Sequence, residues 1–133
     1  MTLPSFAFQK NSGVICELPN ADLLSKEEFK FVGFFSHSLY TITEYSYLVK
    51  DSTNEVIKLN GRRYLIKEIT EDYYEWDYHQ LNRKTLKLNK YQFTKEVMTY
   101  NCNVYSNENE FKNDFDKIKD IYLEAIKKGT NKI

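Results

Sequence analysis

The chain has 133 residues, a formal net charge of zero and a mean hydropathy of −0.63. A zero net charge excludes a global field that would draw the chain to nucleic acid or anionic lipid. No apolar run approaches the roughly 20 residues that span a bilayer, and 4 glycines and 2 prolines argue against a linker-rich chain. The length predicts a single domain over residues 1–133.

The first third of the chain contains short β patterns and one helix signal. Residues 5–9 and 13–18 are largely apolar runs around a polar turn, which is typical of two strands. Ser25 and Glu28 have the spacing of a capping box, which predicts a short helix from about residue 25 to 30. The apolar segment that follows, up to residue 37, fits either a strand or an irregular segment.

The middle of the chain has the period of β-strands. Residues 39–49 alternate, with Tyr45 and Tyr47 expected on one face and Ile42 on the other. A polar cluster at 51–54 predicts a turn. Residues 55–59 and 62–70 flank Asn60 and Gly61, a pair that tolerates the positive φ angles of a type I′ turn, so the sequence predicts a hairpin there.

Residues 69–93 alternate aromatic and charged side chains around a polar turn at 82–85, which predicts a second hairpin. If opposite residues sum to about 167, aromatic rings face one another and acids face lysines. The expected pairs are Trp76 with Tyr91, Tyr74 with Phe93, Asp77 with Lys90, and His79 with Leu88.

The last part of the chain changes from a β to a helical period. Residues 97–105 alternate and predict a final strand that buries Cys102. After Asn107, apolar residues recur at helical spacing, and Gly129 is a natural stop. The predicted stripe comprises Phe111, Phe115, Ile118, Tyr122 and Ala125, widened by Ile121 and Ile126. These elements together predict an α+β fold: a twisted antiparallel sheet of about six strands, rolled toward a half-barrel and packed against a C-terminal amphipathic helix.

The two cysteines, Cys16 and Cys102, do not form a disulfide framework. The N-terminal residues lack a basic start and a continuous apolar core, so the sequence predicts no secretory signal. We therefore expect two reduced thiols in a cytoplasmic protein. A disulfide between them is the alternative if the mature chain comes from a longer precursor.

Residues 81–88, LNRKTLKL, followed by Tyr100 and Cys102, carry the one resemblance in the chain. The stretch looks like a strand–turn–strand pattern, (I/L)(N/D)Rx(T/S)L followed by YxC, in small uncharacterised bacterial and phage proteins. The resemblance implies a prokaryotic or phage accessory protein and carries no activity or functional residues.

The function expected from the sequence is non-enzymatic protein binding, such as that of an inhibitor, immunity or anti-defence protein. The sequence assembles no catalytic set and predicts no cofactor, while Tyr, Trp and Phe, which are enriched at interface hot spots, are abundant. The predicted binding residues lie in the acidic, aromatic half of the second hairpin: Tyr73, Glu75, Asp77, Tyr78 and His79.

Three alternatives use other chemistry. A ligand-binding half-barrel would line its cavity with Tyr45, Tyr47, Trp76 and Tyr100. A metal-dependent hydrolase would use Glu75, Asp77 and His79, which alternate onto one face if they belong to one strand. Nucleic-acid binding would use the lysines of residues 84–95, whose field the acids of residues 71–77 cancel.

Overall fold

A computed structural model describes residues 11–24, 29–50, 52–91 and 96–130. Within them the chain has an α+β fold with nine β-strands and one α-helix, where the sequence predicted about six strands. The strands are β1 Ser12–Glu17, β2 Phe31–Ser36, β3 Thr41–Val49, β4 Val56–Leu65, β5 Glu68–Ile69, β6 Tyr73–Trp76, β7 His79–Asn82, β8 Lys87–Lys90 and β9 Met98–Tyr105, and the helix is α1 Glu108–Thr130. The predicted strand at 5–9 and most of the predicted helix at 25–30 lie outside the described residues.

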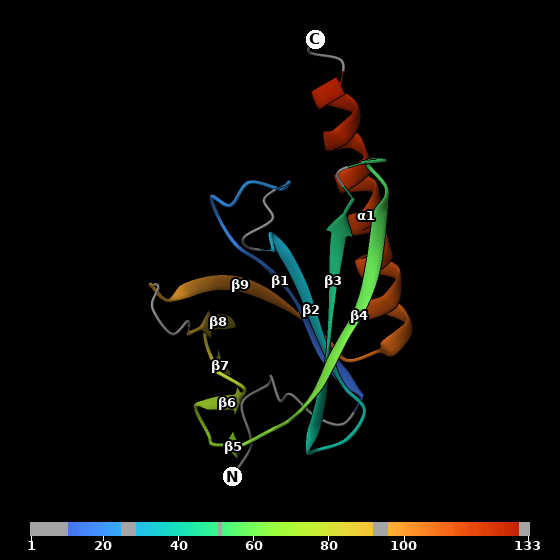
Figure 1. Ribbon diagram of the computed structural model, residues 1–133. Helices are drawn as coiled ribbons and strands as arrows, with labels where there is room; N and C mark the ends of the chain where they lie inside the picture. Colours follow the sequence, from blue (N-terminus) through green and yellow to red (C-terminus); the bar gives the residue numbers. More distant parts are fainter. Residues whose placement is uncertain (1–10, 25–28, 51, 92–95, 131–133) are drawn as a thin grey trace.

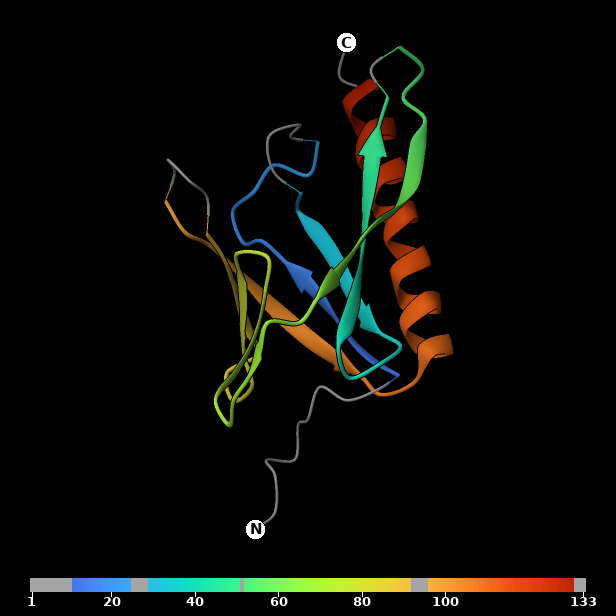
Figure 2. The ribbon, with the colours of Figure 1, turned by 60° about the horizontal axis from the view of Figure 1, so that its bottom comes forward.

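All nine strands belong to one antiparallel sheet with the order β4-β3-β2-β1-β9-β8-β7-β6-β5. The sheet curls into a half-barrel, with β1–β4 on one side and β5–β8 on the other (Figures 1 and 2). α1 lies along the outer side of the β1–β4 half. The predicted half-barrel with a C-terminal helix is therefore confirmed.

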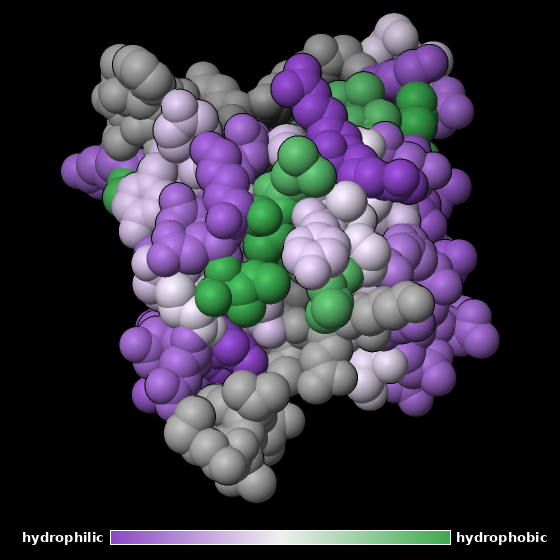
Figure 3. All heavy atoms as spheres, turned by 90° about the horizontal axis from the view of Figure 1, so that it is seen from below, coloured by the Kyte–Doolittle hydropathy of each residue, from purple (hydrophilic) through white to green (hydrophobic). Residues whose placement is uncertain are grey.

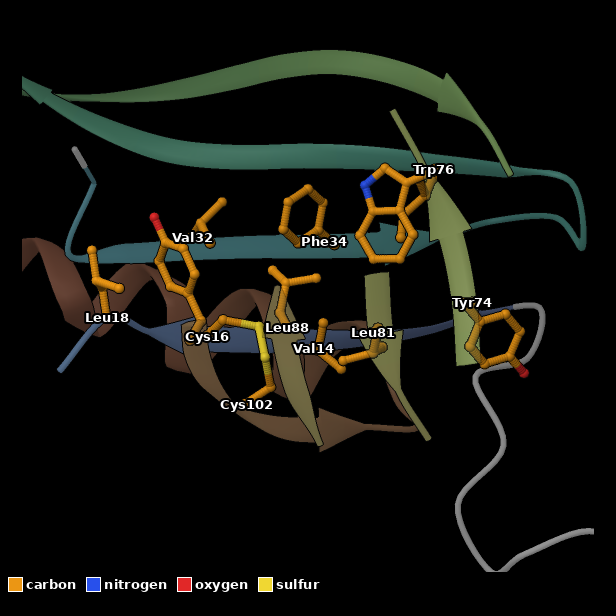
Figure 4. Packing of buried hydrophobic residues seen from close by; sticks show 12 residues of the cluster. Val14, Cys16, Leu18, Val32, Phe34, Tyr74, Trp76, Leu81, Leu88 and Cys102 are labelled. Atoms are coloured by element: carbon orange, nitrogen blue, oxygen red, sulfur yellow. A yellow bond between two sulfur atoms is a disulfide. The ribbon is translucent and has the colours of Figure 1, made fainter. Parts of the chain in front are cut away.

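Side chains of the sheet alternate between two cores. In β3, Ile42 points into the concave side of the half-barrel, whereas Tyr45 and Tyr47 point toward α1, as the sequence predicted. The concave core is shown in Figure 4 and joins the two halves of the sheet: Val14, Cys16, Leu18, Val32, Phe34, Ile42, Tyr74, Trp76, Leu81, Leu88, Tyr100 and Cys102. The helix-side core is built from Ile15, Phe35, Tyr47, Val56, Phe111, Phe115, Ile118 and Tyr122.

The two cores overturn the predicted cavity of the ligand-binding alternative. Trp76 and Tyr100 belong to the concave core, whereas Tyr45 and Tyr47 pack on the helix side of the sheet. The four side chains therefore cannot line one cavity. The concave side is instead filled by packed side chains, as in small barrels.

The prediction of two reduced thiols is wrong. Cys16 in β1 and Cys102 in β9 are directly opposite each other in the antiparallel pair, with Cα atoms 4.0 Å apart, and they form a disulfide. Both side chains lie in the concave core (Figure 4). Both cysteines lie on the buried face of their strands. Their pairing depends on the contact between β1 and β9, and the two residues are 86 positions apart in the sequence.

The hairpin predicted at Asn60 and Gly61 does not form. β4 runs straight through both residues and pairs with β3 along its length, and neither residue has a positive φ. The register shifts between Thr43 and Tyr45, so that Gly61 lies in a β-bulge opposite Glu44. A Cβ atom on Gly61 would lie 2.8 Å from the Glu44 carbonyl oxygen, which explains the glycine.

The predicted hairpin at 69–93 is two hairpins. β6 and β7 are joined by a two-residue turn at Asp77 and Tyr78, and the predicted turn at 82–85 connects β7 to β8. The predicted pairs of Trp76, Asp77 and His79 are consequently wrong, because a turn interrupts what was interpreted as one strand and the β7–β8 register differs by two residues from the predicted one. The predicted partner of Tyr74, Phe93, lies outside the described residues. Trp76 pairs with His79, and His79 also pairs with Lys90.

The helix prediction is confirmed except at its end. The Asn107 side chain accepts a hydrogen bond from the backbone N–H of Glu110 at 3.1 Å, which caps the first turn. α1 continues through Gly129 to Thr130, so this glycine is not the stop that the sequence predicted.

In β2, Gly33 lets α1 approach closely, since a Cβ atom there would lie 2.9 Å from Phe111.

Candidate binding site

The turn between β6 and β7 has an unusual backbone. Its two central residues, Asp77 and Tyr78, have φ angles of 31° and 62°, the positive values of a type I′ turn. Such turns favour asparagine followed by glycine, because a side chain in the left-handed region costs about 1–2 kcal/mol. A tyrosine at the second position is therefore an exception that local backbone preference does not explain.

The Tyr78 side chain stands at the tip of the hairpin with 60% of its surface exposed. The Lys67 ammonium lies over its ring, 5.8 Å from the ring centroid. The backbone N–H of Tyr91 donates a hydrogen bond to the Tyr78 carbonyl oxygen at 2.8 Å. The turn thus contacts the β4–β5 connection and the residue that follows β8, while more than half of its aromatic side chain is exposed.

A cleft of about 200 Å³ lies beside this turn. We call it the tyrosine cleft, and its lining residues come from two strands and three connections: Lys67, Glu75, Tyr78, His79, Gln80 and Tyr91. The Tyr91 hydroxyl donates a hydrogen bond to the side-chain oxygen of Gln80 at 3.3 Å. The cleft therefore combines two tyrosines with a carboxylate, an amide and an ammonium group.

The structure places the predicted binding residues at the tyrosine cleft or close to it. Glu75, Tyr78 and His79 line the tyrosine cleft, and Asp77 lies in the turn beside it. Tyr73 lies on β6 two residues before Glu75, so both side chains leave the same face of that strand.

His79 does not act with Glu75 and Asp77 as one set of ligands. Its ring is 4% exposed and stacks on Trp76 with centroids 5.5 Å apart. Nδ1 lies 2.8 Å from the Asp77 carbonyl oxygen, which fixes Nδ1–H as the donor in that hydrogen bond. Burial lowers the pKa of His79 below its usual value. In the part of the chain that the structure describes, three or more His, Cys, Asp or Glu side chains nowhere gather as a metal site.

The outer face of β5 and β6 is acidic. Glu68 and Glu75 are directly opposite each other in the strand pair, and the Glu68 carboxylate is the main cause of a raised pKa at Tyr73. Like charges in opposite positions of a strand pair destabilise the sheet. This face is thus not arranged for sheet stability alone.

Sequence reasoning missed Lys67, Gln80 and Tyr91 as members of the site. The Lys67 backbone N–H donates to the Glu75 carbonyl oxygen at 2.8 Å, which brings the end of the β4–β5 connection to the cleft. The turn at Asp77 and Tyr78 then folds Gln80 back beside Glu75. An aspartate–tyrosine pair does not indicate a two-residue turn. The sequence therefore did not predict that these three residues line the cleft.

A second exposed surface lies at the lower end of the half-barrel, where apolar side chains gather (Figure 3). The Ile66 backbone N–H donates to the Tyr40 carbonyl oxygen at 2.8 Å, so the β2–β3 connection lies beside the end of β4. Tyr40 is 70% exposed. Tyr40 does not have a positive φ angle, so substitutions at this exposed tyrosine serve as controls for substitutions at Tyr78.

A scan against protein-family models gives no match, and searches of curated proteins and of solved structures give none either. Within the described residues, no helix is both long and apolar enough to cross a membrane. The arguments on function therefore come from the geometry of this chain.

Proposed function

We propose that this protein is a non-enzymatic module that binds another protein through the tip of the β6–β7 hairpin. The observation that carries the proposal is the exposed Tyr78 ring on a left-handed turn. Tyrosine supplies a large, amphipathic contact area, and it is enriched among the residues that dominate binding energy. A turn that accepts backbone strain and exposes such a ring supports a binding role.

The neighbours of Tyr78 support protein binding more than catalysis. Tyr91 offers a second ring, while Glu75 and Gln80 offer polar groups at the rim. His79, the one imidazole among the lining residues, is buried against Trp76 and is held by the Asp77 carbonyl oxygen. The cleft is large enough for about one side chain of a partner.

The source of the protein and its cellular compartment are a separate proposal. The resemblance of residues 81–88 supports a bacterial or phage accessory protein, such as an inhibitor, immunity or anti-defence factor. The disulfide between Cys16 and Cys102 favours an oxidising compartment over the cytoplasmic location that the sequence predicted.

The proposal is tested by affinity capture of partner proteins from cells that produce the protein. The bait is wild type, Tyr78→Ala or, as the control, Tyr40→Ala. We expect a partner that wild type and Tyr40→Ala retain and Tyr78→Ala loses, while all three proteins melt within a few degrees of one another. A partner lost only with Tyr40→Ala would move the binding surface to the lower end of the half-barrel. Equal retention by all three would refute a role for the hairpin tip.

A further inference from the structure

α1 carries more apolar surface than the sheet covers. Phe115, Ile118 and Tyr122 are buried in the helix-side core. Ile121 belongs to the predicted apolar stripe, yet its side chain is 46% exposed. The sequence thus provides an apolar flank on this helix that the fold of the described chain leaves open.

A groove of about 520 Å³ runs along this flank. We call it the α1 groove, and it is lined by Leu23, Asp120, Ile121, Glu124, Ala125 and Lys128. Ile121, Ala125 and Lys128 follow one another at helical spacing along α1, whereas Leu23 comes from the β1–β2 connection. The volume lies within the range of binding grooves, and lining residues at helical spacing suit side chains that project at the same spacing from a second helix.

The charges of the α1 groove indicate which partner fits. Asp120 and Glu124 are four residues apart on the same helix, where two like charges repel each other. Among the described residues neither carboxylate forms a salt bridge, although other acids of α1 do, such as Asp116 with Lys58. Among the described residues that line the groove, Lys128 is the one with a positive charge.

We propose that the α1 groove binds an amphipathic helix of a partner protein that carries leucine-like anchors flanked by lysine or arginine. The anchors fill the space between Leu23 and Ile121, and the basic residues pair with Asp120 and Glu124. A second copy of this chain fits less well. Glu124 lies near the middle of the groove, so a two-fold axis there would bring two copies of this carboxylate together. This surface is separate from the tyrosine cleft and does not depend on it.

The test uses two labelled synthetic 18-residue peptides, one an amphipathic helix of leucine and lysine and the other its leucine–glutamate counterpart. Fluorescence anisotropy with the purified protein should show that the lysine peptide binds at least tenfold tighter. Ile121→Lys should weaken this binding at least tenfold. Leu123→Lys should leave it within twofold, because Leu123 is equally exposed, at 43%, but does not line the groove.

A charge reversal keeps the test independent of folding defects. Asp120→Lys combined with Glu124→Lys should reverse the preference toward the glutamate peptide, with an unchanged melting temperature. The proposal is overturned if Ile121→Lys and Leu123→Lys have equal effects, or if the charge reversal does not change the preference. It is also overturned if sedimentation shows a wild-type dimer that Ile121→Lys dissociates, because the groove then belongs to a second copy.

Discussion

Replacement of Asp77 and Tyr78 by asparagine and glycine should not destabilise the protein. Both residues have positive φ angles, which asparagine tolerates and glycine adopts freely. We expect relief of about 1.5 kcal/mol at position 78, set against about 0.7 kcal/mol for the greater freedom of glycine in the unfolded chain. Loss of the contact between Lys67 and the ring costs about 0.5 kcal/mol at an exposed site. The free energy of unfolding should therefore stay unchanged or rise by up to about 1 kcal/mol.

The assay is urea unfolding of wild type and the double variant, with Tyr40→Gly as the control. Tyr40 is also largely exposed but has no positive φ, so glycine relieves no strain there and should cost about 0.5–1 kcal/mol. A loss of more than about 1 kcal/mol in the double variant would refute the reasoning, since the Tyr78 ring would then stabilise the fold rather than be displayed by it.

Three further predictions test the fold. Replacing Cys16 and Cys102 together by alanine frees a loop of 86 residues and should cost about 4–5 kcal/mol in urea unfolding; a loss below 1 kcal/mol would contradict a disulfide. Gly33→Val should cost about 1–3 kcal/mol because its side chain meets a phenylalanine of α1, whereas Gly129→Ala, with open space around it, should be neutral or stabilising; equal melting temperatures would argue against the close packing. Burial lowers the pKa of His79 in the folded state, so the unfolded chain binds more protons and stability should fall as pH drops below about 6.5, by at most about 1.4 kcal/mol per unit. His79→Phe should reduce this dependence between pH 7.5 and 5.5, and an unchanged slope would show that His79 is not buried in the neutral form.

Local patterns predicted the elements that depend on local physics. Alternation identified the strand that contains Cys102, and the helical spacing of apolar residues after Asn107 identified α1. Asn60 and Gly61 misled the prediction because the same glycine that suits a type I′ turn also suits a β-bulge. Which of the two forms depends on pairing with β3, which is not a local property.

The candidate site was predictable only in part. Glu75 and Tyr78 were expected at a binding surface and do line the tyrosine cleft. Lys67 and Tyr91 reach it through long-range hydrogen bonds that no spacing reveals. The turn at Tyr78 lacks glycine, so the signal that would have divided the predicted strand was missing.

The most direct test of the account is the affinity of a captured partner for wild type, Tyr78→Ala and Tyr40→Ala, measured by titration calorimetry. An interface hot spot contributes about 2 kcal/mol or more, so Tyr78→Ala should weaken binding about 30-fold. Tyr40→Ala should bind within about twofold of wild type. Equal dissociation constants for Tyr78→Ala and wild type would contradict the claim that the β6–β7 turn presents this ring to a protein partner.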